Sequence, residues 1–158
     1  MITKVNFNLN NKDVYIETDS IKRLIDVLRE DFKFTGVKEG CGEGECGACS
    51  VIIDGKLINS CLVPIGTLEG SKIITIDGYR KTHRYEIIKN SFEKVGAVQC
   101  GFCIPGMIMA TEVLLSKKPR PSEADIREGI SGNLCRCTGY NMIVEAISLA
   151  SNKGDGLW

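Results

Sequence analysis

One loop of the chain reads Cys41-Gly42-Glu43-Gly44-Glu45-Cys46-Gly47-Ala48-Cys49, and Cys61 follows after eleven further residues. The first three cysteines have the spacing C-x4-C-x2-C, which is typical of plant-type 2Fe–2S clusters. Each iron of such a cluster needs two thiolates, and the anionic core needs backbone N–H groups turned toward its sulfur atoms. Glycine accepts positive φ and close backbone approach, and four glycines lie in or beside the loop: Gly40, Gly42, Gly44 and Gly47. The spacing predicts one 2Fe–2S cluster on Cys41, Cys46, Cys49 and Cys61.

Two other interpretations of this loop are weaker. Zinc favours two pairs of the C-x2-C type, and a single loop that supplies three thiolates is unusual for it. Residues 42–47 also match the dinucleotide pattern G-x-G-x-x-G, but that pattern requires a helix to follow, and here a strand is expected. Glu43 and Glu45 would repel a pyrophosphate, and we interpret them as solvated loop acids.

A second cysteine group lies in the C-terminal half. Cys100-Gly101-Phe102-Cys103 forms C-x2-C, and Cys135-Arg136-Cys137 forms C-x-C after 31 intervening residues. A zinc site could use the same four sulfurs, and Cys100 with Cys103 could be a redox pair. Each pair precedes a predicted helix, however, and a helix N-terminus favours an anionic ligand. Position therefore favours a second cluster on these four cysteines, with zinc as the alternative, and Arg136 could offset part of the charge.

Composition limits the classes of protein. The chain has 158 residues, 43% of them hydrophobic, and Lys plus Arg equals Asp plus Glu at 20 each, so it lacks the basic excess typical of nucleic-acid binding. No apolar run approaches the length of a membrane span. Residues 1–8 alternate in polarity and lack the apolar centre of a signal peptide, so we expect a cytoplasmic protein. In a reducing compartment, clustered cysteines are more often metal ligands or redox groups than disulfides.

Hydrophobic periodicity divides the chain into a β-rich part and a helical part. Alternation and turn pairs predict five strands, at residues 1–8, 13–17, 50–53, 56–59 and 72–76, with the first two joined by a turn at residues 10–13. Helical spacing predicts one helix capped by Ser20 in the first part. It predicts four helices in the second part, near residues 85–95, 105–115, 123–130 and 142–149, the last capped by Asn141.

These elements predict an α+β fold with domains at residues 1–77 and 84–158 and a linker at 78–83. The glycine-rich tail 152–158 is expected to be loose, although Trp158 could still dock. His83 is expected to be a surface residue, because sulfur already fills every ligand place.

Three segments, in order, resemble the small iron–sulfur subunit of the molybdenum hydroxylases, enzymes such as xanthine dehydrogenase, carbon monoxide dehydrogenase and nicotinate dehydrogenase. They are residues 41–49, residues 99–106 (Gln-Cys-Gly-Phe-Cys-Ile-Pro-Gly) and residues 132–140 (Gly-Asn-Leu-Cys-Arg-Cys-Thr-Gly-Tyr). The resemblance covers nearly the whole chain, and no motif cysteine departs from it.

The resemblance implies more than spacing does. The N-terminal domain should be a β-grasp, plant-type ferredoxin-like domain, and the C-terminal domain an all-α four-helix bundle whose cluster lies nearer the molybdenum. It implies that Gln99 contacts molybdopterin and that the Cys137 sulfur lies against the pterin edge. A partner chain should bind molybdopterin, with the cytosine dinucleotide form expected, and another partner or domain should bind FAD.

The expected function is therefore electron transfer. Electrons released at molybdenum should pass one at a time through the second cluster and the first cluster to FAD, and this chain should make no bond to substrate. The substrate is expected to be an N-heterocycle such as nicotinate or a purine. A free-standing ferredoxin or redox sensor, and a zinc-stabilised interaction module, are the alternatives.

Overall fold

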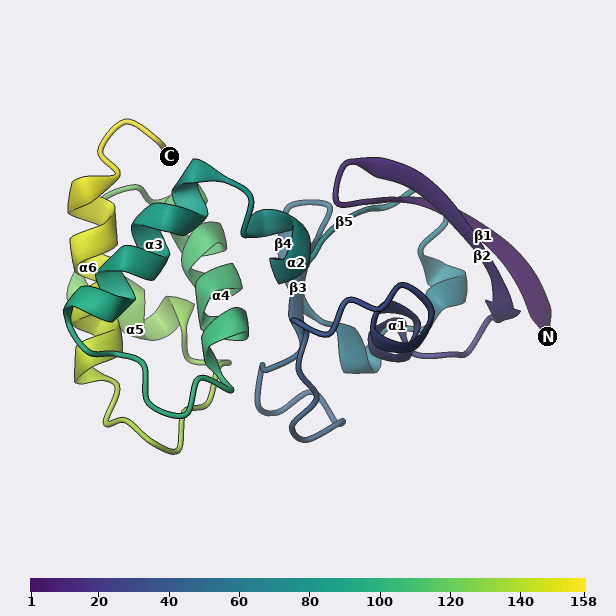
Figure 1. Ribbon diagram of the computed structural model, residues 1–158, viewed down its shortest axis with the longest axis horizontal. Coiled ribbons are helices and arrows are strands. Elements are labelled where there is room, and N and C mark those ends of the chain that lie inside the picture. Colours follow the sequence, from purple (N-terminus) through teal and green to yellow (C-terminus); the bar gives the residue numbers. More distant parts are fainter.

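The computed structural model describes all residues 1–158 and places a β-sheet lobe beside a helical lobe (Figure 1). The sheet has five strands in the order β2-β1-β5-β3-β4. Strands β1 and β5 are parallel, and the other neighbouring pairs are antiparallel. The strands are β1 (Ile2–Leu9), β2 (Lys12–Asp19), β3 (Ser50–Ile53), β4 (Lys56–Asn59) and β5 (Lys72–Ile74). A mixed sheet followed by helices confirms the predicted α+β fold.

Alternating hydrophobic residues form the β1–β2 hairpin. Val5, Phe7 and Leu9 are buried, because every second side chain of a strand points to the same face. Asn10 and Asn11 have φ of 52° and 66°, in the left-handed region that asparagine tolerates in tight hairpin turns. The predicted turn between these strands is confirmed.

The helix predicted after Ser20 begins later than expected. It consists of α1 (Leu24–Asp26) and a π-helical turn η1 (Val27–Asp31), and no side chain caps α1. The Ser20 carbonyl instead accepts a hydrogen bond from the Gly66 N–H at 2.9 Å. Residues 20–22 form a turn, in which the Lys22 N–H donates to the Asp19 carbonyl at 2.9 Å, and Ile21 is 75% exposed. The predicted Ser20 cap is therefore wrong.

Four helices form most of the second lobe: α3 (His83–Lys94), α4 (Ile104–Lys117), α5 (Glu123–Gly129) and α6 (Asn141–Lys153). The Ser122 hydroxyl accepts from the Asp125 N–H, and the Asp125 side chain accepts from the Ser122 N–H. This capping box satisfies two otherwise free donors at the start of α5. Pro105 lies in the first turn of α4, where its missing N–H costs no hydrogen bond.

Two local predictions in this region are wrong. Residues 72–76 do not form a continuous strand, since the chain turns into a short helix, α2 (Ile76–Tyr79). Asn141 does not cap α6, because the cap is Tyr140 in the left-handed conformation, with φ of 68°.

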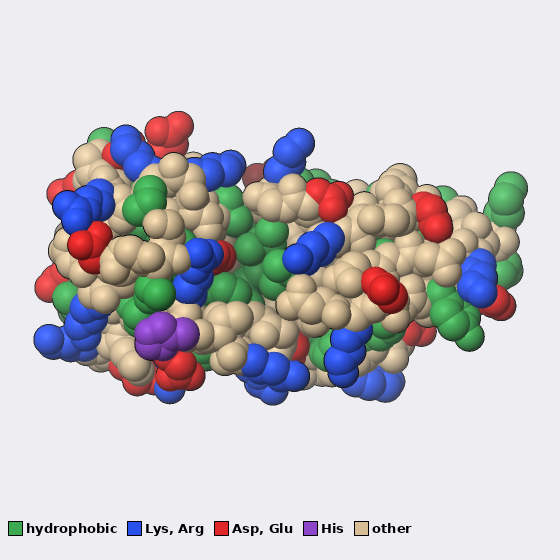
Figure 2. Space-filling model, turned by 90° about the horizontal axis from the view of Figure 1, so that it is seen from above, with side chains coloured by type: hydrophobic (Ala, Val, Ile, Leu, Met, Phe, Trp, Pro, Cys, Tyr) green, Lys and Arg blue, Asp and Glu red, His purple; other side chains and the backbone are tan.

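The two lobes pack against each other. Helix α4 contacts β3 and β4, and Ile52 of β3 is buried in the helical core together with Ile76 and Tyr79 of α2. From above, hydrophobic side chains are visible in the furrow between the lobes (Figure 2). This shared packing fixes the two cysteine-bearing regions in one body. None of the helices has the length and apolar character needed to cross a membrane.

Candidate iron–sulfur centres

Both cysteine groups lie in loops on one edge of the molecule, at the bottom in Figure 1. The first group occupies the loop before β3 and the 3-10 turn η2 (Ser60–Leu62) after β4. The second group occupies the loops before α4 and α6. No disulfide joins any of the eight cysteines.

The first loop wraps its backbone around the Cys41 sulfur. The N–H groups of Glu43, Glu45 and Cys46 donate to Cys41 Sγ at 3.5, 3.3 and 3.4 Å. The donation from Glu43, followed by that from Cys46, lowers the pKa of the Cys41 thiol to about 7. The loop therefore offers a thiolate surrounded by donors, which suits an anionic cluster.

The β3–β4 hairpin brings the two buried cysteines of this group together. Cys49 immediately precedes β3 and Cys61 follows β4, and the Ser60 N–H donates to the Cys49 carbonyl at 3.3 Å. The two cysteines are only 2% and 3% exposed. Burial and, after it, the adjacent Cys49 thiol raise the pKa of Cys61 to about 11. Bound metal would remove this penalty by displacing the proton.

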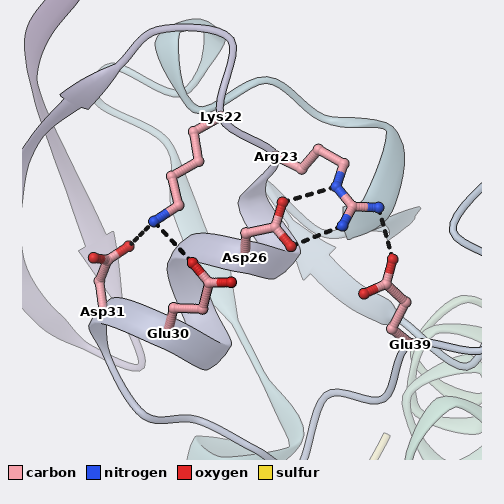
Figure 3. Close-up of polar contacts among 6 residues, drawn as sticks. All are labelled: Lys22, Arg23, Asp26, Glu30, Asp31 and Glu39. Atoms are coloured by element: carbon pink, nitrogen blue, oxygen red, sulfur yellow. Dashed lines mark hydrogen bonds and ion pairs between the residues drawn. The ribbon is translucent and has the colours of Figure 1, made fainter.

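The side of the loop that faces α1 is anchored by Arg23 (Figure 3). Its guanidinium donates two hydrogen bonds to Asp26, both at 2.8 Å, and one to Glu39 at 2.7 Å. A Cβ atom on Gly42 would lie 3.0 Å from the Glu39 carboxylate. The bidentate contact with Asp26 orients the arginine, and through Glu39 it positions the start of the cysteine loop.

The second group surrounds an apolar cavity of about 280 Å³. Phe102, Leu134 and Arg136 line it together with all four cysteines of the group, and its wall also includes Gly40, Cys46 and Ala48 of the first loop. The cavity therefore reaches from the second group to Cys46 of the first. A half-open apolar space with four sulfurs on its wall fits a 2Fe–2S core.

Polar groups near the start of α6 hold Cys135. The Cys135 N–H donates to the Tyr140 hydroxyl at 2.8 Å. Although burial opposes it, hydrogen bonding from Thr138 lowers the pKa of Cys135. Burial raises the pKa of Cys103 to about 12. Sequence reasoning missed the positioning role of Tyr140, for which the only signal was its place at the end of the third motif.

The thiols contact one another in pairs: Cys41 with Cys46, Cys49 with Cys61, Cys100 with Cys137, and Cys103 with Cys135. Structural zinc needs four ligands around one ion, whereas a 2Fe–2S core takes two thiolates on each iron. The paired arrangement therefore favours clusters over zinc at both sites.

The remaining candidate residues lie at the surface. Gln99 is exposed next to Cys100, and Arg136 is exposed at the mouth of the cavity. The structure thus brings Gln99, Cys100 and Cys137 to one accessible face. His83 is exposed on the helical lobe (Figure 2) and lies in neither cysteine site.

Family comparisons match both halves of the chain. Residues 7–73 match the 2Fe-2S iron-sulfur cluster binding domain. Residues 75–148 match the [2Fe-2S] binding domain. The two matches follow each other almost without a gap, and each covers one of the cysteine groups.

Known proteins resemble the chain over nearly its full length. The nicotinate dehydrogenase small FeS subunit of Eubacterium barkeri is 47% identical over 149 residues, covering 94% of this chain and 95% of that protein. The xanthine dehydrogenase iron-sulfur-binding subunit of Escherichia coli O157:H7 is 48% identical and covers 78% and 79%. Among solved structures, quinoline 2-oxidoreductase from Pseudomonas putida 86 superimposes with a TM-score of 0.90 at 36% identity, covering 98% and 96%. The chain belongs to the family of small subunits with two 2Fe–2S clusters that serve molybdenum hydroxylases.

Proposed function

We propose that this chain conducts electrons, one at a time, from the molybdopterin centre of a partner subunit toward FAD. The observation that carries the proposal is the joining of two four-thiol sites in one packed body, with a ligand of the first lining the cavity of the second. When bound, each cluster supplies one-electron redox chemistry, and its potential depends on burial and on hydrogen bonds to sulfur.

The residues that would hold the clusters fall into two sets. Cys41, Cys46, Cys49 and Cys61 form the first, and Cys100, Cys103, Cys135 and Cys137 form the second. In the first set, the chain supplies N–H donors to Cys41 and buries Cys49 and Cys61 away from water. In the second set, the helix that begins at Ile104 points its N-terminal end toward the site, which favours negative charge there.

The second site faces the proposed molybdopterin partner. Two large hydrophobic side chains that line its cavity are exposed, Phe102 by 46% and Leu134 by 54%. Val98, 40% exposed, and Met142, 46% exposed, lie near the cysteines in sequence. Apolar groups gathered at one face are typical of a docking surface. We propose that Gln99 and the Cys137 sulfur contact the pterin there, and that an FAD-binding subunit docks near the first site.

We propose domains at residues 1–77 and 84–158 with a linker at 78–83, and a cytoplasmic location that keeps the thiols reduced. The holoenzyme is proposed to hydroxylate an N-heterocycle. The Eubacterium barkeri relative is named for nicotinate and the Escherichia coli relative for xanthine, so nicotinate and purines are the first substrates to test.

The test is to purify the chain with its native partners. About four irons and four sulfides per chain are expected, against zinc without sulfide for the alternative. Cys49→Ser should abolish one of two paramagnetic signals of the reduced protein and leave the other. Survival of both signals would show that the ligand assignment is wrong. Gln99→Ala should keep both signals but slow reduction of the clusters by substrate. Unchanged turnover in this variant would contradict the proposed contact between Gln99 and the pterin.

A further inference from the structure

Asn133 connects the two cysteine sites through its side chain. Its amide Nδ2 donates to the Gly47 carbonyl at 3.0 Å and to the Ser50 hydroxyl at 3.4 Å. Gly47 lies between two ligands of the first site, and Asn133 lies two residues before Cys135 of the second. The side chain is polar, yet the residue is only 3% exposed. A buried amide is retained at little cost only where it makes such hydrogen bonds.

The backbone beside Asn133 forms a close seam between the same two loops. The Leu134 N–H donates to the Cys46 carbonyl at 2.9 Å. A Cβ atom on Gly47 would lie 2.4 Å from the Gly132 carbonyl, and one on Gly106 would lie 2.4 Å from the Gly47 carbonyl. The backbone at Gly47 therefore approaches that at Gly106 and Gly132 with no side chain between them, and the Asn133 side chain donates across this seam.

The contacts of Asn133 differ from those that hold the lobes together. The lobes pack through α4 against β3 and β4 and through the hydrophobic core around Ile52, to which Asn133 does not belong. The Asn133 side chain bonds only to the first cysteine loop and the start of β3. Loss of these bonds should therefore shift the loops relative to each other while both cores stay folded.

We propose that Asn133 is a positioning residue that sets the distance and orientation between the two clusters. The inference rests on the proposed function, because it requires that both sites hold clusters. Electron tunnelling decays steeply with separation, and the magnetic coupling between two reduced clusters also depends on their separation and relative orientation. A side chain that bonds one ligand loop to the other therefore controls both quantities without touching either set of irons.

The experiment compares Asn133→Asp, Asn133→Ala and the control Asn90→Asp in the complete complex. Asn133→Asp keeps the shape but places a carboxylate against the Gly47 carbonyl, an unfavourable buried contact. Asn133→Ala removes the donor without adding charge. Asn90 is exposed on α3, so its variant reproduces the charge change away from both sites.

Wild-type and Asn90→Asp complexes should show the same magnetic splitting between the reduced clusters and the same rate of electron redistribution after flash reduction. Both Asn133 variants should keep their iron and sulfide, show altered splitting, and redistribute electrons about tenfold more slowly. Amide exchange at Leu134 should accelerate in the same variants while exchange in α3 stays unchanged.

The proposal would be overturned if the Asn133→Ala variant loads iron and shows the wild-type magnetic splitting and the wild-type rate of electron redistribution. If Asn133→Asp does not load iron, Asn133→Ala alone decides the question. Absence of both cluster signals from the wild-type complex would instead contradict the proposed function, so the two failures can be told apart.

Discussion

The two cysteine sites reach four sulfurs by different routes. The first uses one glycine-rich loop and one hairpin, buries Cys49 and Cys61, and surrounds Cys41 with N–H donors. The second joins two short segments at the starts of helices, and leaves Cys100 and Cys137 exposed. The first site thus depends on its own loop conformation, whereas the second depends on helices that a large core already holds. This difference predicts that removal of metal or a change in loop geometry disturbs the first site more than the second.

Removing iron should give the largest contrast. Metal binding stabilises the conformation of its ligands, and the N–H groups of Glu43, Glu45 and Cys46 donate to the Cys41 sulfur and not to a helix or sheet. We expect amide protection at Glu43, Glu45 and Cys46 to fall by about two orders of magnitude in the iron-free protein, and by far less in α4. Hydrogen exchange before and after chelation under reducing conditions measures this. Equal loss in α4 and the first loop would show that the helical lobe also depends on its cluster.

Spacing and periodicity predicted the cysteine groups, the hairpins and the four long helices, because these signals are local. They did not predict where the first helix begins, since Ser20 pairs with Gly66 far along the chain. The role of Asn133 was also invisible, because its partners lie more than eighty residues away. Contacts between distant segments leave no periodic signal, so the links between the sites emerge only from the fold.

Glycine substitutions should give the next largest effect. Gly47 has φ of 71° and its Cβ would clash with the Gly132 carbonyl, whereas Gly101 has φ of 84° and open space around it. Gly47→Ala therefore combines backbone strain with a clash, and we expect it to cost about 3 kcal/mol or more, against about 1 kcal/mol for Gly101→Ala.

Iron content and the midpoint of thermal unfolding measure the difference between the glycine variants. If both variants lose the same amount of iron and stability, the close approach at Gly47 does not make the first loop more sensitive than the second.

A substitution at Trp158 should affect the stability of the helical lobe alone. The tail was expected to be loose apart from a docked Trp158, and the Trp158 indole does donate to the buried Glu112 at 2.8 Å. The Glu112 carboxylate also accepts from the Arg84 guanidinium at 2.8 Å and from the Tyr79 hydroxyl at 2.5 Å. Trp158→Phe keeps the aromatic packing and removes one hydrogen bond to a carboxylate, which should cost about 2 kcal/mol.

The Trp158→Phe variant should unfold its helical lobe at lower temperature, with the first cluster signal unchanged. The conservative control is Tyr15→Phe on the exposed face of β2, which should leave the unfolding temperature as it is. Parallel loss of the first cluster would mean that the two lobes unfold as one unit.

Acid should produce the smallest contrast, between Asp125 in the helical lobe and Asp19 in the sheet lobe. Lys118 and the Ser122 cap lower the pKa of Asp125 to about 2, and the N-terminal ammonium lowers that of Asp19. A folded pKa below the unfolded value of 3.8 means stability that is present above pH 4 and is lost as pH falls toward 2. Asp125→Asn should remove this acid sensitivity from α5, the helix that precedes Asn133. Asp19→Asn should change the acid sensitivity only at the end of the β1–β2 hairpin. Amide exchange followed between pH 4 and pH 2 separates the two, and an identical response of α5 in both variants would show that its capping box does not carry the dependence.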